Sequence, residues 1–238
     1  DKNYHSFFNQ AMAESSAAVN EKGFYSALVI TPSSKIELAG YADVFRFPWL
    51  KFRVDAPSKG YELLTQLTYS PTKRLKALFR YRMESKEEND GQENTVNFLE
   101  TVQKQNYRID LSYKINGSFQ LRNRLEMVQY QKGEQQKEFG YLLYQDVIYK
   151  SMHYKFSGNL RFAIFDTQGF NSRIYTYEND VLYSFSAPGF QNRGTRFYLN
   201  GRYRVKRGID LWLRYSTTNY TNVDEIGSGL DLIEGNRK

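Results

Sequence analysis

The chain contains no cysteine, and its 238 residues include only 2 His, 2 Trp and 5 Pro. The absence of cysteine excludes disulfides, thiolate chemistry and cysteine-ligated zinc sites, and it is compatible with an envelope protein that does not rely on cross-links. No apolar run approaches the roughly 20 residues that a membrane-spanning helix needs, which excludes a bundle of membrane helices. Membrane strands are not excluded, because only every second residue of such a strand faces lipid.

Aromatic and basic residues are abundant. The chain has 20 Tyr and 17 Phe, residues that fit strands and, for Tyr, favour the boundary between membrane and water. Lys and Arg outnumber Asp and Glu by 33 to 26, giving a net charge of +7. Such a charge attracts nucleic acid, anionic lipid or an anionic solute, and composition alone does not choose among them.

The chain divides into two regions. Residues 1–20 begin at Asp1 with neither Met nor an apolar signal segment, which suggests a processed chain or a fragment, and they predict an irregular or short helical lead-in. Across residues 21–238, apolar and polar residues alternate in segment after segment, the pattern of antiparallel strands. About eleven strands are expected, at residues 23–31, 36–45, 61–70, 75–86, 107–115, 119–130, 138–150, 156–166, 173–186, 196–205 and 209–220.

The connections between these strands are of two kinds. Short turns are expected in TPSSK, SPTKR and the Asn116-Gly117 pair, where Asn-Gly tolerates the positive φ angles of a two-residue hairpin turn. Long polar loops are expected at residues 48–60, 84–104, 131–138 and 166–172. Short turns on one rim and long loops on the other are typical of outer-membrane barrels. The segment 173–186 also fits the tip of a short hairpin, although one strand is favoured.

The two faces of the strands indicate the environment. Charged residues lie in the middle of strands, and an Arg facing lipid near the bilayer midplane would cost about 2–4 kcal/mol, so this face must meet water or other charges. The opposite face is apolar, and Tyr61 and Tyr69 lie on it eight residues apart, roughly 20 Å along the membrane normal for a tilted strand. We therefore expect an all-β fold, an antiparallel up-and-down transmembrane β-barrel with about 11–12 visible strands, either whole or part of a larger barrel. The alternative is a soluble antiparallel sheet with one face packed on a core.

Arginines carry the candidate binding site. A lumen lined by them would favour anions such as carboxylates, phosphates or nucleic acid. The same side chains could instead pair with acids on neighbouring strands and fill the barrel, and both interpretations remain open. The arginines are Arg80, Arg82, Arg108, Arg122, Arg124, Arg202 and Arg214.

Catalytic and metal-binding residues are not predicted. His5 and His153 are the only histidines, and each is expected at a surface or in a hydrogen bond. Asp43, Glu178 and Asp180 could form a carboxylate cluster if their strands were adjacent, but ion pairs with arginines are favoured. We expect no enzyme activity, no cofactor and no metal; a membrane-embedded hydrolase is a more distant alternative.

Three stretches carry a family resemblance. Residues 40–71, 173–190 and 211–238, with the sequences PWL, YENDVLYSF and GSGLD, resemble the C-terminal barrel region of ComEA-like helix-hairpin-helix envelope proteins of Gram-negative bacteria. The resemblance implies location in the cell outer membrane and transfers no catalytic residue. No helix-hairpin-helix segment is visible, and the chain ends at EGNRK, where such barrels are expected to continue into a closing strand.

These observations predict an integral outer-membrane barrel that acts as an anion-favouring, porin-like channel or as the membrane anchor of an envelope assembly. Its expected partners are outer-membrane lipid, an anionic solute or DNA, and other envelope proteins. The alternatives are the barrel region of a protein that binds DNA or takes it up, and a soluble β-sheet binding domain.

Overall fold

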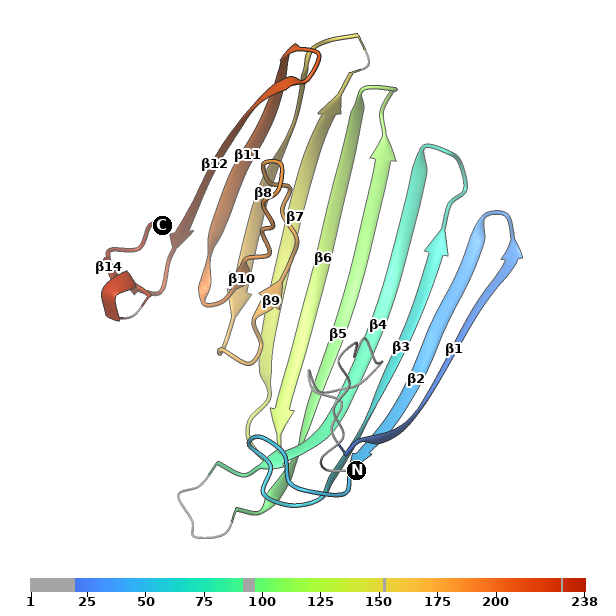
Figure 1. Ribbon diagram of the computed structural model, residues 1–238, viewed down its shortest axis with the longest axis vertical. Helices are drawn as coiled ribbons and strands as arrows, with labels where there is room; N and C mark the ends of the chain where they lie inside the picture. The colour runs from blue at the N-terminus through green and yellow to red at the C-terminus, as the bar shows by residue number, and fades with distance from the viewer. Residues whose placement is uncertain (1–19, 92–96, 152, 228) are drawn as a thin grey trace.

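A ten-stranded antiparallel sheet dominates the computed structural model, which describes residues 20–91, 97–151, 153–227 and 229–238. Each strand pairs with its neighbour in the order β1-β2-β3-β4-β5-β6-β7-β8-β11-β12 (Figure 1). The strands are β1 (Lys22–Ser33), β2 (Ile36–Phe47), β3 (Ser58–Tyr69), β4 (Leu75–Asn89), β5 (Leu99–Lys114), β6 (Phe119–Lys132), β7 (Glu138–Lys150), β8 (Phe156–Thr167), β11 (Arg193–Lys206) and β12 (Ile209–Tyr220).

Smaller elements lie outside this sheet. β9 (Ile174–Tyr175) pairs with β10 (Gly189–Phe190), and β13 (Glu225–Ile226) pairs with β14 (Ile233–Glu234), next to the 3₁₀ turn η1 (Gly229–Asp231). Within the described ranges, no helix has the length and apolar character required to cross a membrane. The expected lead-in at residues 1–20, with His5, lies almost wholly outside the described residues.

The sheet is open. β1 and β12 form its two edges and do not pair with each other (Figure 1), so the all-β antiparallel fold is confirmed while closure into a barrel is not seen. At the β12 edge, residues 236–238 begin a further pairing: the Lys238 N–H donates to the Thr218 carbonyl at 2.9 Å and the Tyr220 N–H donates to the Asn236 carbonyl at 2.7 Å.

Ten of the expected strands are present in the predicted order. The prediction of one strand at residues 173–186 is wrong, because this segment contributes only the two-residue β9 and an isolated bridge from Glu178 to Ser186. The expected loop at residues 84–104 is also shorter than predicted, since β4 continues to Asn89 and β5 begins at Leu99. Along this part of β4, Lys86 Nζ lies 2.9 Å from Glu84 Oε1 and 3.6 Å from Glu88 Oε1.

The hairpin at Asn116-Gly117 is confirmed, but its predicted turn geometry is wrong. Neither residue has a positive φ, and the connection spans residues 115–118. Asn116 closes it through its side chain, whose Oδ1 accepts hydrogen bonds from the N–H groups of Ser118 and Phe119, each at 2.9 Å. A side chain that mimics a backbone turn removes the need for left-handed angles. Gly208, between β11 and β12, does have a positive φ of 86°.

The two rims differ as predicted, except that the long loop expected at residues 131–138 is wrong, because β6 extends to Lys132 and leaves a five-residue connection, residues 133–137. The connections β1–β2, β3–β4, β5–β6, β7–β8 and β11–β12 are short and lie at one end of the sheet, which we call the short-turn rim (Figure 1). The connections β2–β3, β4–β5, β6–β7 and β8–β11 lie at the other end, the long-loop rim, and all but β6–β7 are long.

The predicted separation of side chains into two faces is confirmed by the strand register. We call the side that carries Arg80, Arg108 and Arg124 the polar face, and the side that carries Leu67, Ile109 and Leu125 the apolar face. No other layer of the described chain covers the apolar face, where eleven large side chains keep 38% to 69% of their surface exposed. They are Leu63, Leu67, Phe79, Ile109, Leu111, Leu125, Leu143, Phe162, Ile164, Leu211 and Leu213.

The hydrophobic core lies on the polar face. It consists of side chains from β6, β7 and β8 beneath the β8–β11 connection, which contributes Ile174 and Phe190. These two side chains are each 2% exposed. The main core cluster therefore forms where this connection folds back over the sheet. Phe45, Phe47, Val54 and Val102 are buried outside this cluster.

Candidate functional site: an arginine-rich face and the segment folded onto it

Arginine and acid side chains pair across neighbouring strands of the polar face. Arg108 on β5 makes a two-pronged contact with Glu126 on β6, with both N–O distances at 2.9 Å. Arg161 on β8 does the same with Asp146 on β7, at 2.5 and 2.8 Å. Such fork-to-carboxylate contacts are geometrically specific and stronger than neutral hydrogen bonds.

The Arg161–Asp146 pair is the most buried of these contacts. The side chains are 3% and 0% exposed, and the guanidinium carbon of Arg161 also lies 3.7 Å from the ring centroid of Tyr144. A buried charge pair needs good geometry and further polar contacts to offset the loss of hydration. Arg161 supplies one by donating from Nη1 to the Tyr177 carbonyl at 2.8 Å.

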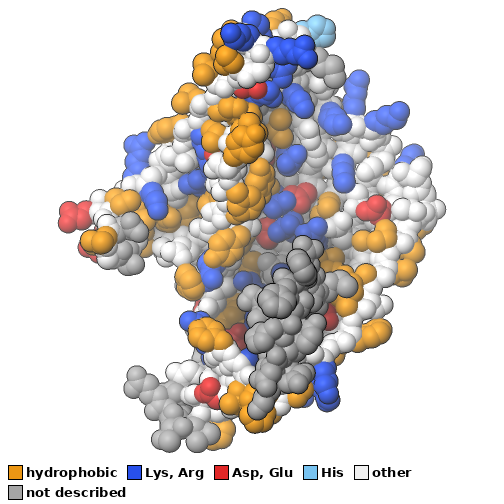
Figure 2. Space-filling model, viewed as in Figure 1, with side chains coloured by type: hydrophobic (Ala, Val, Ile, Leu, Met, Phe, Trp, Pro, Cys, Tyr) orange, Lys and Arg blue, Asp and Glu red, His pale blue; other side chains and the backbone are white. Residues whose placement is uncertain are grey.

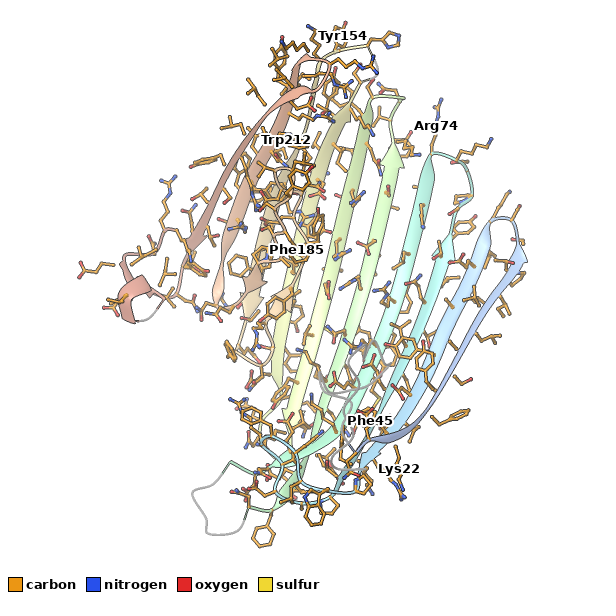
Figure 3. The ribbon with its side chains drawn as sticks, in the orientation of Figure 1. Lys22, Phe45, Arg74, Tyr154, Phe185 and Trp212 are labelled. Carbon is orange, nitrogen blue, oxygen red and sulfur yellow. The ribbon has the colours of Figure 1, made fainter. Side chains whose placement is uncertain are left out.

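Tyr177 belongs to the connection between β8 and β11, residues 168–192, which we call the inner segment. It lies against the polar face in front of β7 and β8 (Figure 1). Its alternate side chains Ser172, Ile174, Thr176 and Glu178 are buried, while Tyr175 and Tyr177 are exposed. Figure 3 shows Phe185 on the same segment.

Ion pairs hold the inner segment against β11 and β12. The Glu178 carboxylate accepts hydrogen bonds from Arg196 Nε at 2.7 Å and Arg214 Nη2 at 2.6 Å. Arg214 also pairs with Asp180. Glu178 has no exposed surface, so these two guanidinium groups supply the polar contacts that its carboxylate needs in a buried position.

Close backbone packing fixes the start of the inner segment. Gly140 on β7 faces the Ser172 carbonyl so closely that a Cβ at residue 140 would lie 2.1 Å from that oxygen. Glycine is therefore required at this position for the segment to reach the sheet.

Six of the seven predicted arginines have a polar partner. Arg82 pairs with Glu62 at 2.5 Å, Arg124 with Asp110 at 2.6 Å, and Arg202 with Asp210 at 2.7 Å. Arg108 and Arg214 pair as described above, and Arg80 donates from Nε to Gln66 Oε1 at 2.8 Å. Five of these six partners are carboxylates that compensate the charge, and no ion pair within the described residues involves Arg122.

Arg122 lies within a group of uncompensated cations. Ser112 on β5 is flanked by Lys76 on β4 and Arg122 on β6, and Lys114 follows two residues along β5. Lys150 lies on the same face of β7, and no ion pair within the described residues involves any of these four cations. Lys76, Lys114, Arg122 and Lys150 are named here the vestibule cations.

The short-turn rim extends this positive region. Its five connections contain no Asp or Glu, whereas they carry Lys35, Lys73, Arg74, Lys155 and Arg207. Figure 2 shows most of the Lys and Arg side chains of this face gathered toward that rim, and most of the acidic ones farther from it.

Two groups of residues were missed or only partly recognised from the sequence. Arg196 was not selected, although it shares the period-2 pattern of Arg202 and thus the same face. The sequence alone does not show that the lysines among the vestibule cations lack acidic partners, because this depends on the register of neighbouring strands.

The three carboxylates considered as a cluster do not meet. Glu178 and Asp180 form the ion pairs with arginines that were favoured, while Asp43 lies on β2, separated from β11 by β3 to β8. His153 lies exposed in the β7–β8 turn. Within the described ranges, no group of three or more His, Asp or Glu residues is arranged to hold a metal ion.

Comparison with known proteins adds no family. No protein-family model, curated protein or solved structure matches the chain.

Proposed function

We propose that the chain is an integral β-barrel of the cell outer membrane, or a large part of one. It serves as a channel or as the membrane anchor of an envelope assembly. Its polar face lines a water-filled interior that favours anions, and its apolar face contacts lipid.

The uncovered apolar face is the observation that carries this proposal. Eleven large apolar side chains remain 38% to 69% exposed, although soluble monomers rarely expose contiguous apolar patches larger than a few hundred Å². Lipid would cover them. The tyrosines Tyr61, Tyr69, Tyr113, Tyr141 and Tyr203 lie on this face, each near a strand end, where aromatic residues favour the membrane boundary.

Closure of the sheet is required by this proposal. Unpaired backbone groups inside a bilayer cost several kcal/mol each, so the edges at β1 and β12 must pair with each other or with further strands. The hydrogen bonds of residues 236–238 with Thr218 and Tyr220 support such an extension at the β12 edge.

The vestibule cations support the preference for anions. Most lumen arginines are already compensated by carboxylates, so a lumen selecting for anions relies on charges that are not compensated. Lys76, Lys114, Arg122 and Lys150 supply such charges on the polar face.

The test is membrane behaviour followed by conductance. The protein should partition into detergent and migrate differently on gels before and after heating. In planar bilayers under a KCl gradient, an open channel should give a reversal potential whose sign shows selectivity for chloride over potassium. Absence of conductance would instead support the anchor role. A monodisperse soluble protein without detergent would contradict the proposal and support the soluble β-sheet binding domain.

A second candidate function is supported by the basic short-turn rim. The barrel would belong to a DNA-binding or DNA-uptake protein, in line with the resemblance to helix-hairpin-helix envelope proteins. Lys35, Lys73, Arg74, Lys155 and Arg207 would contact phosphates. Affinity for DNA should then fall steeply with salt, and weak binding without such a slope would contradict this candidate.

A further inference from the structure

A row of like charges crosses the apolar face near the long-loop rim. Lys22 on β1 pairs directly with Arg46 on β2, and Arg46 pairs directly with Lys59 on β3. Lys59 shares its face with Leu63 and Leu67, so the row lies on the apolar side. All three basic side chains are exposed, and no ion pair within the described residues involves them.

This arrangement is unfavourable by itself. Directly opposite residues of an antiparallel pair have Cβ atoms about 4.5–5.5 Å apart, and like charges at such positions destabilise the sheet. Most arginines of the polar face are compensated by carboxylates across the strands, whereas this row is not. An anion bound from outside the chain would remove the repulsion.

A hollow of about 670 Å³ lies beside the row. Phe24, Val44 and Tyr61 line it with apolar surface. Each lies two residues along its strand from a basic residue of the row, and the three are themselves direct cross-strand neighbours. Figure 3 shows Lys22 and Phe45 near each other at this end of the sheet.

We propose that this surface, the Lys22–Arg46–Lys59 row with its hollow, binds a lipid whose headgroup carries phosphate. The three cations contact the phosphate, and an acyl chain occupies the hollow against Phe24, Val44 and Tyr61. This inference rests on the proposed membrane location and adds a specific lipid site to it.

A lipid fits the surface better than a free phosphate ion does. The cations lie on the apolar face near the long-loop rim, where they would meet the headgroup region of a membrane. Basic clusters next to the headgroups attract anionic lipids. An inorganic phosphate would contact the three basic side chains but not the apolar residues that line the hollow. Glu87 borders the hollow and accepts a hydrogen bond from the Lys59 N–H at 3.0 Å, so the phosphate is expected nearer Lys22 and Arg46.

The experiment uses the full chain in neutral detergent with lipids of one acyl length. Phosphatidylglycerol and phosphatidylcholine are titrated separately and the bound complexes are counted by native mass spectrometry. The parent should prefer phosphatidylglycerol. The variant K22Q/R46Q/K59Q should lose roughly a hundredfold in affinity for phosphatidylglycerol and little for phosphatidylcholine.

A matched control removes the same charge elsewhere. K76Q/K114Q/K150Q also deletes three positive charges, but on the polar face away from lipid, and it should bind phosphatidylglycerol like the parent. If this control loses as much affinity as K22Q/R46Q/K59Q, net charge explains the binding and the site is overturned.

Two further measurements separate the alternatives. Shortening the acyl chains of phosphatidylglycerol should weaken binding to the parent, and inorganic phosphate should compete poorly; equal binding of phosphate and lipid would overturn the lipid assignment. Without anionic lipid, K22Q/R46Q/K59Q should resist urea better than the parent, because the like-charge repulsion is gone. A lower resistance would contradict the energetic argument.

Failure of the lipid site and failure of the membrane proposal give different results. A protein that enters micelles but binds both lipids equally overturns only the lipid site. A protein that stays monomeric and soluble without detergent contradicts the membrane location, and with it the lipid site that depends on it.

Discussion

Glu178 and Arg214 connect two distant parts of the chain, with Glu178 Oε2 accepting a hydrogen bond from Arg214 Nη2 at 2.6 Å. Glu178 lies in the inner segment and Arg214 on β12. Arg196 on β11 contacts the same carboxylate. This acid is therefore one of the contacts that hold the inner segment on the polar face, together with the Arg161–Tyr177 hydrogen bond and the buried Ile174.

Replacing Glu178 should release the inner segment. In Glu178→Gln, Arg196 loses its carboxylate partner and Arg214 keeps only Asp180. Breaking a buried ion pair on one side costs about 3–5 kcal/mol. Urea unfolding should show this loss, and limited proteolysis should cut within residues 181–186 faster than in the parent. Asp166→Asn is the control: its pair with Arg193 is exposed, at 44% and 63%, so about 0–1 kcal/mol is expected. Equal losses in both variants would contradict the fastening role.

The Arg161–Asp146 pair should behave as a unit. Asp146→Asn alone leaves an uncompensated buried guanidinium and should cost about 3–5 kcal/mol, whereas D146L/R161M, which removes both charges, should cost much less. A double-mutant cycle on the free energy of unfolding measures the coupling. Additive losses would show that the two side chains do not depend on each other.

The vestibule cations should govern ion selectivity. K76Q/K114Q/R122Q/K150Q removes four uncompensated charges and should lower the chloride-to-potassium permeability ratio severalfold. The reversal potential in planar bilayers measures this ratio. R108Q/E126Q removes a compensated pair, leaves the net charge unchanged and should leave the ratio near that of the parent. If both variants shift it equally, the paired and unpaired groups are not distinct in function.

A charge on the apolar face should block membrane insertion. Leu143 lies mid-strand on β7 and is 51% exposed, so Leu143→Arg should cost about 2–4 kcal/mol near the bilayer midplane. The fraction of protein that shows heat-modifiable migration in vesicles should fall. Ile148→Arg, on the polar face of the same strand and opposite the neutral Gln120 and Asn159, should insert normally. Undiminished folding of Leu143→Arg in aqueous buffer would favour a soluble sheet instead.

Alternation of residue types predicted the main sheet well. Strands such as β5 and β6 alternate so regularly that order, pairing and the two faces follow from the sequence. The Asn116-Gly117 hairpin was also predictable, but its angles were not, because the Asn116 side chain closes the turn by hydrogen bonds that residue identity alone does not specify.

The inner segment shows where the same reasoning fails. Residues 172–178 alternate between buried and exposed side chains, as a strand of the sheet would. Alternation reports only that one side of an extended chain is covered. Here that side is covered by the face of the sheet, which the segment contacts through Thr176 and Glu178. A segment packed on a sheet and a strand paired within the sheet give the same sequence pattern.

Charge pairing was only partly predictable. The arginines could be assigned to one face from their spacing, but which of them have acidic partners depends on strand register. Arg108 lies opposite Glu126, and Arg122 lies opposite Asp146, whose carboxylate is already taken by Arg161. A register shift of one residue would turn the arginines of a strand to the opposite face and away from these acids.

The inner segment also makes the two halves of the polar face unequal. It contacts β6, β7, β8, β11 and β12 through Arg124, Leu142, Arg161, Arg196 and Arg214, while the described residues place no such cover over β3 to β5. Any solute that passes along this face in front of β7 and β8 would therefore contact the inner segment. A molecule designed to block passage by binding to this part of the sheet would find the inner segment already bound there.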